Sequence, residues 1–178
     1  YHYEGSTFCD RSQISPDGQY IAYVVDKGES RSIFIKDILG ESEIELFDGL
    51  KSVNCLKWSP TGNEIFFSAG FSNSTYSSYI IPKLGGKTQQ FQYNQNGSWS
   101  PDGSLIAGIR VSDKQIKLIK RETGDIYKLL DLTGSFTWLF DIDWSPNGKK
   151  LAFNTSDNNT GTSTIWTINI DGTQQQKI

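Results

Sequence analysis

A short turn motif that occurs four times in the 178-residue chain constrains its fold more than any other feature. Each copy reads Ser-Pro-x-Gly, and consecutive prolines are 44, 41 and 45 residues apart. Proline fixes φ at the first central position of such a turn, Asp or Asn suits the next, and glycine provides the positive φ that follows. Repetition at this period predicts stacked copies of one supersecondary unit. The four turns are residues 15–18, 59–62, 100–103 and 145–148.

Apolar runs follow every turn in the same order. Tryptophan precedes three of the turns (Trp58, Trp99 and Trp144), and Ile14 holds that position in the first. Runs rich in β-branched and aromatic residues, separated by short polar stretches, are typical of β-strands, and no helical pattern competes with them. Each repeat therefore predicts four short antiparallel strands. The runs are 21–23, 33–35 and 44–47; 65–67, 79–81 and 90–93; 106–108, 116–119 and 126–130; and 151–153, 165–170 and 174–178.

The repeated unit, Trp-Ser-Pro-Asp-Gly followed by an apolar triplet and a second apolar run, resembles the TolB-type, WD-like β-propeller repeat. The same repeat occurs in TolB, in the gating propellers of prolyl-oligopeptidase-like peptidases, and in bacterial sensor and surface proteins. The resemblance covers nearly the whole chain. It implies an all-β fold, a β-propeller built of four-stranded antiparallel blades. One blade cannot bury both faces of its sheet, and radial stacking of blades buries them.

Four repeats predict four blades, at approximately residues 6–47, 48–93, 94–130 and 131–178. Counting back from the first turn places an outer strand at residues 1–3, and another lies at 174–178. Four structures fit this count: an arc of a larger ring, a half that pairs with a second copy, an open array of chains, or a four-bladed ring. Strands at both ends leave sheet edges and faces that favour pairing with other chains. We therefore expect a piece or half of a larger assembly, and a homo-oligomer.

Composition excludes several classes of protein. There are 17 basic and 20 acidic residues, so the net charge of −3 provides no basic field for nucleic acid. No apolar run is long enough to span a membrane. The only histidine is His2 and the only cysteines are Cys9 and Cys55, too few ligands for a zinc site and a poor basis for a catalytic triad. We expect no catalytic site in this chain and no cofactor.

The loops carry the candidate binding residues, because variable loops on a repeated scaffold usually carry function. Phe136, Trp138 and Phe140 recur at period two on one face of an extended segment, and such aromatic anchors are enriched at binding hot spots. The alternative, which we favour, is a long inner strand whose aromatics pack between blades. Phe71 and Tyr76 lie in a Ser/Asn-rich loop and are expected to be more exposed.

Acidic residues offer a weaker signal for metal binding. Asp141 and Asp143 flank Ile142 on the expected fourth inner strand and are candidate ligands or partner contacts, although hydrogen bonding to nearby amides or hydroxyls explains them as well. The run 157–159 lacks the pattern of a calcium loop, so no metal site is assigned. The repeated tryptophans are expected to be inter-blade core. Cys9 and Cys55 are expected to be buried thiols, with a disulfide between them as the alternative.

Two functions from different classes remain. The first is a non-catalytic protein-interaction or self-assembly module whose partner is another protein or a copy of itself. The second is an accessory propeller of a larger enzyme, such as a gate of a prolyl-oligopeptidase-like peptidase. Low charge, high Ser/Thr/Asn/Gln content and the resemblance to a periplasmic family suggest a periplasmic or secreted location. Four Asn-x-Ser/Thr sequons agree with that location: Asn73, Asn96, Asn154 and Asn158.

Overall fold

The structure is a computed structural model that describes residues 12–71, 76–92, 96–110 and 112–178. These residues form four separate sheets, each of four strands in which every strand pairs antiparallel with the next along the chain. We call the sheets blades 1 to 4. No helix occurs in the described ranges. The fold is therefore all-β, as the repeats predict.

The strands coincide with the apolar runs of each repeat. Their bounds are β1 Ser12–Ile14, β2 Tyr20–Asp26, β3 Arg31–Asp37 and β4 Glu43–Leu50 in blade 1; β5 Ser52–Trp58, β6 Glu64–Gly70, β7 Tyr76–Pro82 and β8 Gln89–Gln92 in blade 2; β9 Asn96–Trp99, β10 Leu105–Ile109, β11 Gln115–Lys120 and β12 Ile126–Asp131 in blade 3; and β13 Trp138–Trp144, β14 Lys150–Asp157, β15 Thr162–Asn169 and β16 Gln176–Lys177 in blade 4. The outer strand expected at residues 1–3 lies outside the described residues.

Each Ser-Pro-x-Gly turn joins the first two strands of its blade through the same hydrogen bonds. In the third turn the amide of Gly103 donates to the carbonyl of Ser100 at 2.8 Å, and the amide of Leu105 donates to Ser100 Oγ at 2.9 Å. The other three turns repeat both bonds at their equivalent residues. Because the glycine in each has a φ of about +70°, a conformation that only glycine adopts readily, the motif specifies this turn locally.

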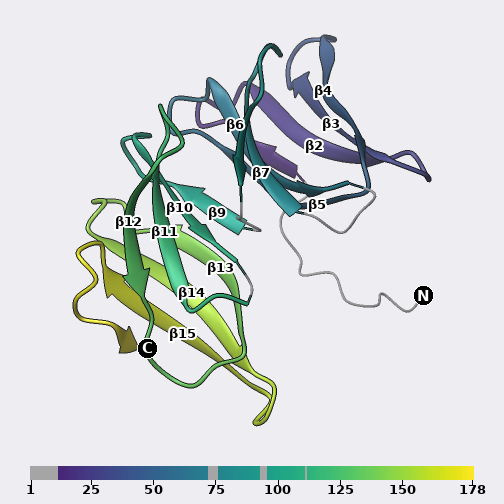
Figure 1. Ribbon diagram of the computed structural model, residues 1–178. Coiled ribbons are helices and arrows are strands. Elements are labelled where there is room, and N and C mark those ends of the chain that lie inside the picture. The colour runs from purple at the N-terminus through teal and green to yellow at the C-terminus, as the bar shows by residue number, and fades with distance from the viewer. Residues whose placement is uncertain (1–11, 72–75, 93–95, 111) are drawn as a thin grey trace.

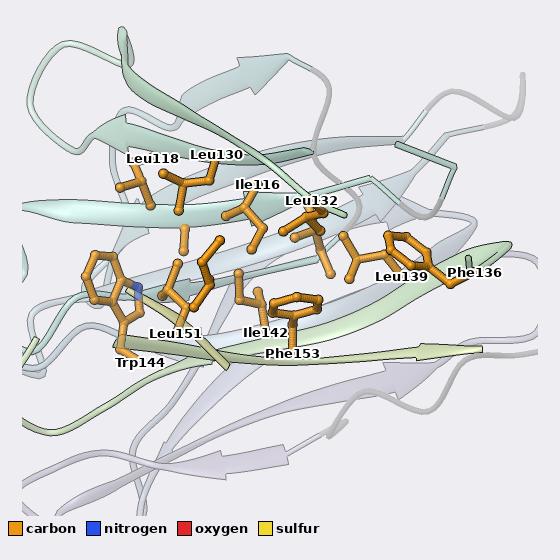
Figure 2. Packing of buried hydrophobic residues seen from close by; sticks show 13 residues of the cluster. Ile116, Leu118, Leu130, Leu132, Phe136, Leu139, Ile142, Trp144, Leu151 and Phe153 are labelled. Carbon is orange, nitrogen blue, oxygen red and sulfur yellow. The ribbon is translucent and has the colours of Figure 1, made fainter. Parts of the chain in front are cut away.

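The blades stack in an open, curved row, with blade 1 (purple) and blade 4 (yellow) at opposite ends (Figure 1). Three buried apolar clusters lie between consecutive blades: one between blades 1 and 2, one between 2 and 3, and one between 3 and 4. Figure 2 shows the last of these, in which Trp144 and Leu151 of blade 4 lie against Leu118 and Ile116 of blade 3. Among the described residues no cluster joins blade 4 to blade 1, so the single chain forms an arc.

The repeated tryptophans link the blades as well as fill the core. The indole Nε1 of Trp58 donates to the carbonyl of Gln13 at 2.9 Å, that of Trp99 to Lys57 at 3.3 Å, and that of Trp144 to Ser98 at 3.1 Å. Each acceptor lies on the inner strand of the preceding blade. All three tryptophans are less than a tenth exposed. They are inter-blade core residues, as expected from their recurrence.

Acid should destabilise the turns. The carboxylate of Asp102 accepts hydrogen bonds from Ser100 Oγ and from the amide and hydroxyl of Ser104, which hold its pKa below the ordinary 3.8. Hydrogen bonds from Ser15 Oγ and the Gln19 amide lower the pKa of Asp17 in the same way. A carboxyl with a lowered folded-state pKa contributes stability that is complete above the unfolded pKa and is lost as pH falls through the folded one.

We therefore expect the urea midpoint to fall as the pH is lowered from about 5 towards 2. Asp102→Asn should make this decline shallower and leave the turn intact, because the fourth turn already has an amide there, with Ser145 Oγ donating to Asn147 Oδ1. Chemical denaturation across that pH range measures both curves. Parallel curves for the wild type and Asp102→Asn would show that this carboxylate contributes nothing to the acid response.

Candidate functional site

The two ends of the arc each leave one sheet face that no described residue covers. We call the side of a blade that meets the preceding blade its front face and the opposite side its rear face. The front faces of blades 2, 3 and 4 and the rear faces of blades 1, 2 and 3 lie in the three buried clusters. The front face of blade 1 and the rear face of blade 4 are left open. These two faces are the candidate functional site.

The front face of blade 1 is apolar and aromatic at its centre. The rings of Tyr23 and Phe34 stack across β2 and β3 with centroids 5.9 Å apart, and both side chains are half-buried. Ile21 lies beside them, and Ile14 on β1 is 61% exposed. Blades 2 and 4 carry stacked aromatic pairs at the same register, and there the pair is packed against the preceding blade. Blade 1 thus exposes an aromatic surface of the kind that a preceding blade covers in blades 2 and 4.

The aromatic pairs occupy equivalent positions in three blades. In blade 2, Phe67 and Tyr79 are register partners with centroids 5.1 Å apart, and both are less than a tenth exposed. In blade 4, Phe153 and Trp166 are register partners at 6.4 Å and nearly parallel. Register partners on one face are the unit of side-chain packing in an antiparallel sheet. The pair in blade 1 therefore belongs to a packing pattern that elsewhere is completed by a neighbouring blade.

Charged groups border the aromatic pair of blade 1. Lys27 Nζ lies 5.5 Å from the centroid of the Phe34 ring and 2.6 Å from the carboxylate of Glu45. The hydroxyl of Tyr23 donates to the carboxylate of Glu43, and this hydrogen bond is the main cause that raises the pKa of Tyr23 to about 12. Exposed ion pairs contribute little to stability. These contacts therefore leave the face available to a partner.

The rear face of blade 4 contains a shallow hollow of about 240 Å³. In the register of the sheet, Ala152 pairs with Asp143, and Asn154 pairs with Asp141 on one side and Ile165 on the other. The residues that line the hollow are Asp141, Ile142, Asp143, Ala152, Phe153, Asn154 and Ile165. Ala152 and both aspartates are exposed, and Ile165 is 56% exposed. The side chain of Ala152 is a single methyl group, so it fills little of this space.

Hydrogen bonds orient the two aspartates. Asp143 Oδ1 accepts from Ser98 Oγ of blade 3 at 2.7 Å and from the amide of Trp144 at 2.9 Å. Asp141 Oδ1 accepts from the amide of Ile142, and the amide of Asp141 donates to Asn154 Oδ1. Hydrogen bonding to amides and hydroxyls, the structural explanation given by the sequence, is what the structure shows for both. No three His, Cys, Asp or Glu side chains within the described ranges are grouped closely enough to hold a metal ion.

The aromatic row expected at residues 136–140 is interrupted. Phe136 is only 8% exposed and belongs to the cluster between blades 3 and 4, with Lys114 Nζ 5.3 Å from its ring centroid. Trp138 begins β13 and is half-buried. The pairing of β13 with β14 shifts between Leu139 and Asp141, so Phe140 is the extra residue of a β-bulge. The three aromatics therefore do not share one face. Phe136 packs between blades, as the favoured alternative predicts, whereas Trp138 pairs with Ser156 on the rear face and the bulge removes Phe140 from the alternation.

The other two predicted residues lie at the loop end of blade 2. Phe71 is 39% exposed, and its ring centroid lies 6.3 Å from Phe47 and 6.1 Å from Tyr79. Tyr76 begins β7, pairs with Gly70 and is half-buried. Phe71 thus extends the aromatic cluster between blades 1 and 2 towards solvent. Of the six predicted residues, Trp138 and Asp141 lie on an open blade face, because their register partners Ser156 and Asn154 share the rear face of blade 4 with Ala152.

Sequence reasoning missed Tyr23, Phe34 and Ala152. The available signal was the alignment of the repeats: these residues occupy positions that are buried in the neighbouring copies. That alignment alone does not show which face of an end blade is left open, because the direction of stacking is a property of the assembled arc.

Burial bears on two further sequence predictions. Cys55 is 1% exposed, as expected, and its Sγ lies 3.5 Å from the carbonyl oxygen of Gly97; the alternative of a disulfide involves Cys9, which lies outside the described residues. Asn96 is 2% exposed, and its side-chain amide donates to the carbonyl of Phe140. The folded chain therefore cannot carry a glycan at this sequon. Asn73 lies outside the described residues.

A second hollow of about 260 Å³ lies on the turn side between blades 3 and 4. Pro101 and Leu105 of blade 3 and Trp144, Pro146 and Ile170 of blade 4 provide its apolar lining. The same position between blades 2 and 3 is crossed by Arg121, whose Nε donates to Glu64 at 2.8 Å. Between blades 3 and 4, Leu105 occupies the position of Glu64 and Ile170 occupies that of Arg121. The hollow there is therefore apolar.

Comparison with solved structures identifies the architecture. TolB from Acinetobacter baumannii superposes with a TM-score of 0.69 at 18% identity, over 93% of this chain and 42% of that one. The putative TolB from Agrobacterium tumefaciens gives 0.66 at 24%, over 94% and 60%. The fold is a TolB-type β-propeller fold. Kuenenia stuttgartiensis hydrazine synthase shares it, with a TM-score of 0.72 at 19% identity over 94% of this chain and 53% of that one.

The propeller chain thus spans roughly half the length of these similar structures. Searches with protein-family models and against curated protein sequences gave no match. At these identities the comparisons establish the fold alone. In the part of the chain that the structure describes, no helix is long and apolar enough to cross a membrane.

Proposed function

We propose that this chain is a non-catalytic protein-interaction module that binds protein through the open faces of its two end blades. The observation that carries the proposal is the stacked pair of Tyr23 and Phe34, which no described residue of another blade covers. Blade 2 buries its pair at this position, and blade 4 packs Phe153 and the partly buried Trp166 against blade 3. Burial of apolar surface contributes about 25 cal/mol per Å², and exposed apolar patches on such a scaffold are typical of interaction sites.

The open faces also suit binding because they are rigid. Both belong to regular sheets whose other faces are fixed by the buried clusters between blades. Side chains held on strands lose little further freedom when a partner docks, which lowers the entropic cost of association. Interaction sites on rigid elements are also more specific than sites on loops.

We further propose that the module is periplasmic or secreted. The low charge of the chain and its high Ser, Thr, Asn and Gln content support this location, as does the likeness to two TolB proteins.

An accessory propeller within a larger enzyme is the second candidate. The hydrazine synthase that shares the fold is an enzyme, and the present chain covers 53% of the chain compared. A catalytic domain encoded in the same gene would favour this candidate over a free-standing module.

Site-specific photo-cross-linking tests the proposed function. A photoreactive amino acid replaces Ile14 on the front face or Ile165 on the rear face, and Leu39, which is 95% exposed in the loop between β3 and β4, provides the control. In the cells that produce the protein, positions 14 and 165 should each capture a polypeptide that position 39 does not. That polypeptide should bind the purified chain, and Phe34→Glu or Ala152→Arg should abolish the binding. Equal labelling at all three positions would contradict the proposal.

A further inference from the structure

The three internal joints between blades follow one rule of size matching. Where the rear face of a blade has alanine at its centre, the next blade has a stacked aromatic pair: Ala22 shares a cluster with Phe67 and Tyr79, and Ala107 shares one with Phe153. Where the rear face has phenylalanine, the next blade has glycine, since a Cβ on Gly97 would lie 2.8 Å from Phe66 Cζ. Large side chains therefore meet small ones at every joint, as close packing requires.

The two open faces match each other by the same rule. The rear face of blade 4 has Ala152 at the position of Ala22 and Ala107, and the hollow around it has a volume of about 240 Å³. The front face of blade 1 has the pair Tyr23 and Phe34 at the position of Phe67 and Tyr79. The rear face of blade 4 thus corresponds to the alanine side of an internal joint, and the front face of blade 1 corresponds to the aromatic side. The two blades lie at opposite ends of the chain (Figure 1).

Among the residues described, the turns of blades 1 and 4 also lack a contact that the turns of neighbouring blades make with each other. In each internal joint the turn glycine of one blade lies against the turn proline of the blade before it: a Cβ on Gly62 would lie 3.5 Å from Pro16 Cδ, and those on Gly103 and Gly148 would each lie 3.8 Å from the preceding proline. A Cβ on Gly18 would have no described atom within 4 Å. Pro146, in the turn of blade 4, has no turn glycine of a described residue against it.

The two open faces also carry charged residues. The front face of blade 1 carries Lys36, the register partner of Ile21, at a position that is isoleucine in the three other blades. The rear face of blade 4 carries Asp141 and Asp143. Asp143 precedes Trp144, at the turn end of its strand, and Lys36 pairs at the turn end of β2. The two carboxylates lie on the innermost strand of blade 4 and Lys36 lies on the third strand of blade 1, so the charged groups border different strands of the joint.

We propose that the rear face of blade 4 docks onto the front face of blade 1 of a second copy, head-to-tail, forming a joint like the three within the chain. The inference rests on the proposed function and names its partner. Two such joints between two chains would close a ring, and successive joints would form an open chain. Either arrangement covers the Tyr23–Phe34 pair and fills the hollow around Ala152.

The joint between copies differs from the internal joints in one contact. Each internal joint has an indole hydrogen bond to the preceding blade, and the equivalent acceptor on blade 4 is the carbonyl of Asp143. Blade 1 has Ile14 in place of tryptophan and cannot donate. The joint between copies is therefore weaker than those within the chain, and association should depend on concentration.

Complementary face variants test the proposal. Ala152→Arg fills the rear hollow with a charged side chain, and Phe34→Glu places a carboxylate in the front pair; both positions are at least partly exposed, so the blades should still fold. Circular dichroism and melting check the folding. Ile14→Glu, at a 61% exposed position, provides a second front variant if Phe34→Glu is unstable.

Light scattering and analytical ultracentrifugation between about 1 and 100 µM should give a species of at least twice the 20.0 kDa chain mass for the wild type. Each variant alone should be a monomer. Their equimolar mixture should form a 1:1 dimer and nothing larger. Phe34→Glu keeps an intact rear face and Ala152→Arg keeps an intact front face, so only one joint can form. Ile14→Trp should tighten association about tenfold, by restoring one hydrogen bond and its apolar contact.

Three results would overturn the inference. A wild type that stays monomeric throughout the range excludes the joint, and so does association that neither variant weakens. Association lost in only one variant shows like faces pairing. In each case, cross-links from positions 14 and 165 to a different protein would leave the proposed function standing, whereas the absence of any cross-link would remove that function as well.

Discussion

Replacing Trp144 with alanine should lower the free energy of unfolding by about 3–5 kcal/mol, the usual cost of removing a buried tryptophan. The side chain is 9% exposed and lies in the cluster between blades 3 and 4, opposite Leu118 and Leu130 (Figure 2). Its truncation leaves a cavity and also removes the hydrogen bond from the indole Nε1 to the carbonyl of Ser98. Urea or guanidinium denaturation of the purified chain measures the loss.

Two further variants divide this effect into its parts. Trp144→Phe keeps most of the buried area and removes the indole donor, so it should lose a smaller amount, of about 1–3 kcal/mol, than Trp144→Ala. Trp138→Ala changes the same residue type on the same strand at a half-buried position and should cost much less. Equal losses for Trp144→Ala and Trp138→Ala would contradict the role of Trp144 at the joint between blades.

Replacing Gly97 with valine should destabilise the chain by about 3 kcal/mol, at the upper end of the usual cost of overpacking. A Cβ there would lie 2.8 Å from Phe66 Cζ and 3.1 Å from the backbone carbonyl oxygen of Ala107. Phe66 is fully buried, and the carbonyl belongs to β10, which pairs with β9. Neither neighbour can move away freely, so the joint between blades 2 and 3 has to open.

A double-mutant cycle isolates this clash. Phe66→Ala alone should cost about 3–5 kcal/mol because it leaves a cavity. Gly97→Val together with Phe66→Ala should cost less than the sum of the two single changes, by about 1–3 kcal/mol, because the valine then occupies space that the ring has left. Strict additivity in denaturation experiments would show that Gly97 and Phe66 are not matched in size.

The two open faces carry different consequences from these internal joints. Substitutions at Trp144 or Gly97 act on stability, because they change a surface that is buried within one chain. Substitutions at Phe34 or Ala152 should act on association and leave stability nearly unchanged, because those side chains lie at the ends of the arc. The contrast separates scaffold residues from candidate binding residues by two different measurements.

The sequence by itself determined the local structure of the chain. The Ser-Pro-x-Gly motif specifies its own turn, since the hydroxyl of the serine, the fixed φ of the proline and the positive φ of the glycine act within six residues. The turn then sets the pairing of the two strands that it joins, and the alternation of apolar residues assigns their faces. Recurrence of tryptophan at one position indicated a core role, and all three tryptophans are buried between blades.

Only the tertiary structure decided which faces remain open and how the blades match. The bulge at Phe140 interrupted the expected alternation of aromatic residues along β13. A register shift of this kind depends on the partner strand and not on the alternation within one strand. The pairing of Ala22 with an aromatic pair and of Phe66 with Gly97 joins residues of different repeats, which no local pattern relates. For the same reason the open arc, with Tyr23 and Phe34 at one end and Ala152 at the other, follows from the direction in which blades stack. That direction is set by contacts between residues some forty positions apart.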